Sequence, residues 1–174
     1  MTFFIKSIQS MSKFCGVLAA LLVSAAILVD CQMVVMRYFL NMSTVWQTEF
    51  VTYSIVAATF LGSPYVLLIK GHVNVDLLPH YLSALPKKIL AIFASLLALV
   101  FCFVLAWQSY NFFYEALEGG WLTDTIWELP LWIPYLPMFV GTALLCLQYV
   151  ADILCIAFNF EYLSILAAPQ QEGE

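Results

Sequence analysis

Four long apolar runs constrain this chain more than any other feature of its sequence. They cover about residues 14–36, 46–69, 89–114 and 131–158. An α-helix rises roughly 1.5 Å per residue, so about twenty apolar residues cross the roughly 30 Å hydrocarbon layer of a bilayer. Because the runs do not alternate between apolar and polar residues, they predict four transmembrane helices rather than the strands of a barrel.

The composition favours a membrane protein and excludes other classes. Of the 174 residues, 64% are hydrophobic and only 10% are charged. A soluble domain of this size needs a more charged surface. Six Lys and Arg residues are too few for a patch that binds nucleic acid. We therefore expect an all-α integral membrane protein, with residues 1–174 forming one membrane domain.

The basic residues predict the side of the membrane on which each connection lies. In a four-span topology, five of the six Lys and Arg residues share the side of the N-terminus, and Arg37 falls on the other. Cytoplasmic segments carry an excess of Lys and Arg, so we expect both termini in the cytoplasm. Residues 160–174 are expected to form a loose tail. The five basic residues are Lys6, Lys13, Lys70, Lys87 and Lys88.

Small residues recur at every fourth position in the first two apolar runs. This spacing places them on one face of each helix, where a second helix can approach closely. We expect the first two helices to pack together through these faces, and Pro64 to kink the second of them. The six positions are Gly16, Ala20, Ser24, Ser54, Ala58 and Gly62.

Charged and aromatic residues mark the turn between the first two runs. Arg37 ends the first run at the depth where Glu49 begins the second, with Trp46 beside it at the expected interface. We expect an ion pair between Arg37 and Glu49 that holds this connection. Such a pair contributes little to stability if water reaches it.

The segment between the second and third runs predicts a surface element. Apolar residues recur at near-helical spacing over about residues 73–85, although Pro79 interrupts them. We expect a short amphipathic element on the cytoplasmic surface. His72 and Asp76 are interpreted as groups that fix the loop, because Asp caps turns and His bridges to backbone carbonyls.

The titratable residues do not indicate a catalytic, substrate-binding or metal site. His72 and His80 share one loop, whereas membrane cytochromes hold haem between histidines on facing helices. A metal site formed by these two and Asp76 would be interrupted by Pro79. The five cysteines are scattered and predict small buried side chains. We therefore expect no enzyme activity, no cofactor and no metal.

The acidic residues leave a second function open. Asp30, Glu49 and Asp152 lie toward the ends of their runs, and no run carries a charge at its centre. A charged residue within a span is a functional candidate by default. One alternative is therefore a small, self-sufficient transporter or channel that works as an oligomer, with Asp30 or Asp152 facing its path. A further alternative is the membrane anchor subunit of a redox enzyme.

Several motifs, taken in order, resemble the small membrane subunit of tripartite ATP-independent periplasmic (TRAP) transporters, the DctQ-like family. The glycine–histidine pair with an aspartate four residues after the histidine is its most recognisable signature. In the family's Trp-x-Glu-Glu motif, Thr48 replaces the first Glu. The stretches that carry the resemblance are Arg37-Tyr38-Phe39 with Asn41, Trp46-Gln47-Thr48-Glu49, Phe60-Leu61-Gly62, Gly71 to Asp76, Leu85-Pro86 and Leu129 to Pro137.

The resemblance implies a scaffold subunit in the bacterial inner membrane. Its partners would be a larger elevator-type membrane subunit, which carries sodium and substrate, and a periplasmic substrate-binding protein. The substrates would be organic acids such as dicarboxylates or sialic acid. Besides the small helix-packing residues, six residues are then structural or partner-interface candidates: Arg37, Trp46, Glu49, Gly62, His72 and Asp76.

Overall fold

The computed structural model describes residues 2–69 and 84–157, and these form four helices. Each helix is long and apolar enough to cross a membrane. Within the described residues, the only β-structure is one isolated bridge. The expected all-α membrane fold with four spanning helices is confirmed. The helices are α1 (Thr2–Phe39), α2 (Val45–Leu68), α4 (Ala84–Gly119) and α5 (Trp132–Ala157).

Two of the helices are much longer than the apolar runs that predicted them. Helix α1 has 38 residues and α4 has 36, so each is more than 50 Å long at about 1.5 Å per residue. They must tilt or extend beyond a hydrocarbon layer of roughly 30 Å. The expected surface element lies mainly in residues 70–83, outside the described residues. Its last residues, Ala84 and Leu85, belong to α4.

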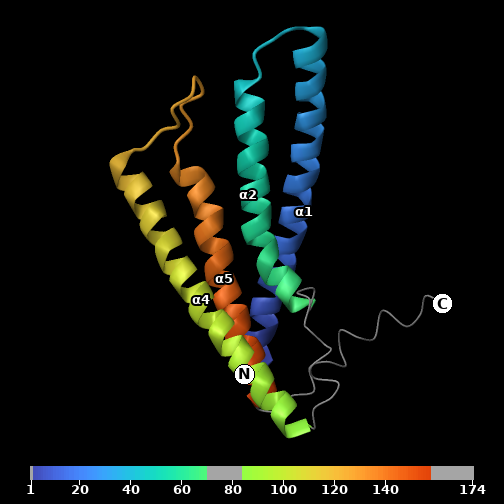
Figure 1. The fold of residues 1–174 in the computed structure, drawn as a ribbon, viewed down its shortest axis with the longest axis vertical. Coiled ribbons are helices and arrows are strands. Elements are labelled where there is room, and N and C mark those ends of the chain that lie inside the picture. The colour runs from blue at the N-terminus through green and yellow to red at the C-terminus, as the bar shows by residue number, and fades with distance from the viewer. Residues whose placement is uncertain (1, 70–83, 158–174) are drawn as a thin grey trace, which may run out of the picture.

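The helices form two hairpins rather than a closed bundle. Helix α1 packs along α2, α4 packs along α5, and the hairpins join mainly through α2 and α5. Figure 1 shows α1 and α2 side by side, with α4 and α5 forming the second pair. The order of packing is therefore α1–α2–α5–α4. Helix α4 lies at one edge of this row and has its most extensive contact with α5.

Short connections join the helices of each hairpin at the same end of the molecule, which we call the connection end (Figure 1). Residues 40–44 link α1 to α2, and Asn41 adopts a left-handed conformation with φ 48°. Asn tolerates this conformation better than most residues, which suits it to a turn just past a helix. The opposite end, at which α1 begins, is called the N-terminal end.

Two prolines, one of them the Pro64 that was expected to kink its helix, lie inside continuous helices. Pro64 is part of α2 and Pro137 is part of α5. The last turns of α2 change direction in Figure 1, as expected for a proline that removes one helical hydrogen bond. The bend at Pro64 therefore agrees with the expected kink.

The interior is small, and large apolar side chains cover the outside. One buried cluster contains Cys15, Leu61 and Leu144, with Leu22 and Val140 packed against it. The sides of α1 and α4 expose many Leu, Val and Phe side chains. This distribution suits a lipid environment, because burial between helices gains little hydrophobic free energy there and close packing decides the contacts.

Candidate functional site

Small residues bring α1 and α2 close together. A Cβ atom added at Gly16 would lie 2.5 Å from Cγ of Tyr65, so only a glycine fits against this ring. One added at Gly62 would lie 3.4 Å from Cβ of Ala19, at ordinary contact distance. Ser54 and Ala58 are buried on α2. The two helices therefore pack against each other, as the spacing predicted.

The face that α1 buries differs from the expected one. Ala19 and Ala26 are buried, whereas Ala20 and Ser24 are exposed. The Ser24 hydroxyl donates to the carbonyl of Ala20 in its own helix, at 2.9 Å. Because a helix has about 3.6 residues per turn, a strict four-residue spacing drifts around its surface. The prediction that Ala20 and Ser24 lie in the contact with α2 is therefore wrong, because both lie on the outside of the described chain.

A glycine that no sequence pattern marked allows α5 to approach α2. A Cβ atom added at Gly141 would collide with the carbonyl group of Phe60. That carbonyl lies four residues before Pro64, which has no N–H to donate to it. The contact thus places a glycine against a backbone group that the proline leaves free. One sequence signal could have identified this contact. It is a lone glycine in an apolar run that lies opposite a run containing a proline.

The expected ion pair between Arg37 and Glu49 is not formed in the described structure. Arg37 is exposed, whereas Glu49 is 8% exposed and neither of its carboxylate oxygens has a hydrogen-bond partner. Its neighbour Thr48 faces α1, since its hydroxyl donates to the sulfur of Met33 at 3.4 Å. Successive helix residues are rotated by about 100°. Glu49 therefore lies about 100° around α2 from the side that Thr48 turns toward α1.

A second unsatisfied polar group lies two residues before Glu49 in α2. Gln47 is 2% exposed, and its side-chain oxygen has no hydrogen-bond partner. Trp46 is exposed and contacts Trp127 edge to face, with ring centroids 6.4 Å apart. The start of α2 thus combines an interfacial aromatic pair with two buried polar side chains, Gln47 and Glu49, whose side-chain oxygens have no hydrogen-bond partner.

A short polar chain joins α1 to α5 near the N-terminal end. The Ser12 hydroxyl donates to the side-chain oxygen of Gln148 at 3.2 Å, and the Gln148 amide donates to a carboxylate oxygen of Asp152 at 3.5 Å. Ser12 and Gln148 are fully buried. Such bonds hold helices together in membranes. Asp152 therefore accepts a hydrogen bond from the residue that joins α5 to α1, whereas Asp30 is exposed on α1.

Several predicted residues cannot be placed in a site. His72, Asp76 and His80 lie outside the described residues. Among the residues that are described, no three His, Cys, Asp or Glu side chains converge as metal ligands. The described cysteines Cys15, Cys31, Cys102 and Cys146 are free thiols.

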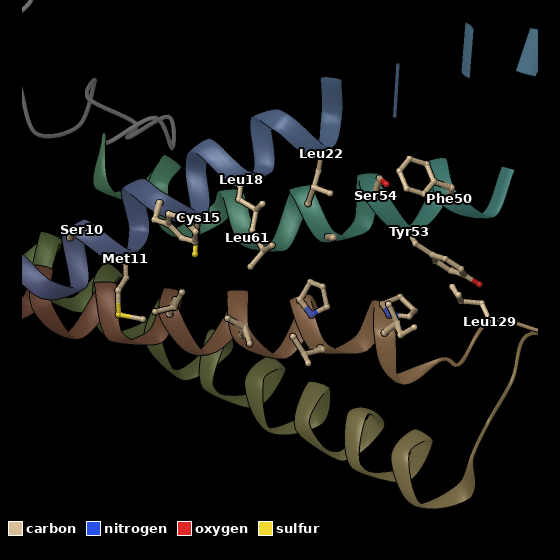
Figure 2. A pocket seen from close by; sticks show the side chains of 18 of the residues that line it. Ser10, Met11, Cys15, Leu18, Leu22, Phe50, Tyr53, Ser54, Leu61 and Leu129 are labelled. Atoms are coloured by element: carbon tan, nitrogen blue, oxygen red, sulfur yellow. The ribbon is translucent and has the colours of Figure 1, made fainter. Parts of the chain in front are cut away.

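An apolar groove of about 860 Å³ runs along the molecule between α1 and α5, with α2 as its floor. Figure 2 shows it extending from Ser10 and Met11 at one end to Tyr53 and Leu129 at the other. Nearly all of its lining side chains are apolar. The groove arises because α1 packs mainly on α2 and touches α5 far less.

The connection between α4 and α5 contributes the far end of the groove. It is an ordered loop in which Thr123 N–H donates to Leu129 O at 3.0 Å and Leu131 N–H donates to Trp121 O at 2.9 Å. Trp127 and Leu129 from this loop line the groove. The loop therefore forms the lining of the groove at the connection end.

Two comparisons with known proteins extend this description. The family model for the DctQ component of tripartite ATP-independent periplasmic transporters matches residues 26–159. A C4-dicarboxylate TRAP transporter small permease protein from Vibrio cholerae serotype O1 is similar to this chain, with 26% identity over 154 residues. The similarity covers 76% of this chain and 66% of that protein, just under two thirds of its length.

Proposed function

We propose that this chain, which belongs to the DctQ component family of tripartite ATP-independent periplasmic transporters, is the fixed scaffold beside a larger transport subunit. The match over residues 26–159 carries this proposal, since it includes all of α2, α4 and α5 and residues 26–39 of α1. The chain is a multi-pass protein of the inner membrane. The expected orientation, with both termini in the cytoplasm, is part of the proposal.

The placement of polar groups supports a scaffold over a self-sufficient transporter. Asp30 is exposed on α1, Glu49 is buried in the first turns of α2, and Asp152 accepts a hydrogen bond from Gln148 within α5. Each lies toward an end of its helix. Glycine contacts at Gly16 and Gly141 hold the helices closely together. Tight packing suits a part that stays still while its partner moves.

The proposed transporter imports an organic acid with sodium. Its larger subunit is of the elevator type and carries sodium and substrate, and a periplasmic binding protein delivers the substrate. The name of the Vibrio cholerae relative specifies a C4-dicarboxylate. A dicarboxylate is therefore the first substrate to test here, with sialic acid as the second. The proposal assigns no residue of this chain to substrate binding.

The exposed and partner-directed residues complete the proposal. Arg37 and Trp46 are exposed at the connection end, where a neighbouring subunit can reach them. We assign both, with Glu49 and Gly62, to structural or partner contacts. His72 and Asp76 are assigned to the same role from the family motif alone.

Purification from native membranes tests this function. The chain is tagged at its C-terminus, extracted in mild detergent, and its associated proteins are identified. We expect one larger hydrophobic protein in a fixed ratio, and sodium-dependent uptake only when both proteins and the binding protein are reconstituted in liposomes. Uptake by this chain alone would overturn the scaffold and favour the oligomeric transporter. A haem absorbance band would instead favour a redox anchor.

A further inference from the structure

The groove between α1 and α5 is open along its side. The hydrogen bond from Ser12 to Gln148 joins the two helices among the first residues that line the groove on α1. Trp127 and Leu129 complete the lining at the connection end, where Figure 2 shows Leu129. The lining side chains Met11 and Phe14 are exposed, so an apolar chain from the surrounding lipid can enter the groove sideways.

The part of the groove that α1 lines, at its N-terminal end, matches one leaflet in length. Its lining on α1 runs from Ser10 to Leu22, which is about 18 Å at roughly 1.5 Å per residue. Half of a hydrocarbon layer of roughly 30 Å is about 15 Å. Apolar cavities of this kind do not retain water. An acyl chain therefore fits the groove in chemistry and in length.

Two positive charges stand at the N-terminal end of the groove. Lys6, Ser10 and Lys13 follow at i, i+4 and i+7, which places them on one side of α1. Ser10 lines the groove, and all three residues are exposed. Lysine side chains extend toward the membrane surface and attract anionic headgroups. The charges thus lie where the headgroup of a lipid in the groove would be.

We propose that this groove binds an acyl chain of an anionic phospholipid from the leaflet at the N-terminal end of α1. Lys6 and Lys13 hold the phosphate, and the lipid fills the space between α1 and α5 against Leu18 and Leu22. The lipid thereby connects two helices that touch each other far less than α1 touches α2. The proposal rests on the geometry of this chain and does not depend on the identity of the transported solute.

Native mass spectrometry of the purified chain, with the proteins that accompany it, tests this proposal. Delipidated samples are titrated with phosphatidylglycerol or phosphatidylcholine of the same acyl composition. We expect phosphatidylglycerol to bind about tenfold more tightly, because two lysines near the membrane surface favour the anionic headgroup. Lys6→Gln with Lys13→Gln should remove this preference. Lys87→Gln with Lys88→Gln, at the start of α4, serves as the matched control and should keep it.

A second variant separates the acyl site from general attraction to lysines. Leu18→Trp places a larger side chain in the groove, and we expect it to lower binding of both lipids. Leu96→Trp, on the exposed side of α4, is the control and should bind both as the wild type does. Equal affinity for the two lipids, or no effect of Leu18→Trp in a folded protein, would overturn the proposal. A cross-link from position 18 to a helix of a partner protein would also overturn it.

Discussion

At the scale of single residues, Glu49 is the least satisfied group in the described chain. Its carboxylate is buried, and neither oxygen has a hydrogen-bond partner. Removing an ionised carboxylate from water without a partner costs several kcal/mol. The side chain therefore weakens the isolated subunit, and its presence is explained if a cationic or donor group of a partner reaches it after assembly.

The unpartnered Glu49 carboxylate predicts that one substitution has opposite effects on the stability of the isolated chain and on the yield of complex. Glu49→Gln removes the charge at nearly constant shape, so we expect the thermal midpoint of the isolated chain to rise by a few degrees. The yield of complex with the larger subunit should fall. Both are measured in the same detergent, by thermal unfolding and by co-purification. Glu115→Gln, at an exposed carboxylate, is the control and should change neither; a lower midpoint for Glu49→Gln contradicts the argument.

Gly141 gives a second prediction at this scale. Gly141→Ala places a methyl group against the Phe60 carbonyl, and backbone atoms cannot rotate away as a side chain can. We expect a loss of about 1–3 kcal/mol in stability, as in other overpacked contacts. The measurement is the unfolding free energy in detergent.

Gly62→Ala is the matched control for Gly141→Ala. Its new methyl group would meet Ala19 at 3.4 Å, so the better helix propensity of alanine should leave stability unchanged or slightly higher. If both alanine variants behave alike, the close contact between α5 and α2 does not determine stability.

At the scale of the helices, the α1–α2 hairpin depends on small side chains at its contact. Gly62→Leu introduces a large side chain opposite Ala19 and should separate the helices. We expect a lower yield of folded chain and of complex, measured by size-exclusion chromatography. An unchanged yield of complex would contradict this role for Gly62.

Ala20→Leu on α1 provides the comparison for Gly62→Leu, because Ala20 is exposed. The isolated chain should tolerate it, with a thermal midpoint close to that of the wild type. Its effect on co-purification then tests whether the exposed face with Ala20 and Ser24 contacts the partner. A loss of stability in the isolated chain would instead indicate that Ala20 packs against another helix of this chain, as the four-residue spacing predicted.

At the scale of the whole molecule, the helices form an open row with few buried large side chains. Helix α4 has its main support from α5 and exposes residues such as Phe101 and Phe103. A protein of this shape leaves much of its surface to lipid or to a partner. Binding to the folded state alone stabilises that state. The scaffold should therefore be more stable within its complex than by itself.

Co-expression tests this expectation. The chain purified with its larger subunit should unfold at a higher temperature than the chain purified alone, at equal detergent concentration. Adding an unrelated membrane protein should have no effect. Equal midpoints with and without the co-purified subunit would mean that the row of helices is self-sufficient.

The sequence alone determined the fold class, the number of spanning helices and the pairing of the first two. These features follow from local properties: the length of an apolar run and the presence of small residues along it. The ends of α1 and α4 were less predictable, because polar residues continue a helix beyond the hydrocarbon when no residue stops it. The family resemblance likewise depended on short motifs in order rather than on contacts.

Only the tertiary structure decided how each helix is rotated about its axis. It placed Ala19 rather than Ala20 against α2, left the buried Glu49 carboxylate without Arg37 as its partner, and set Gly141 against Phe60. It also left the groove between α1 and α5. In a chain that is apolar on nearly every side, no polar face marks the inside of a helix. Contacts between segments far apart in the sequence must therefore fix the rotation.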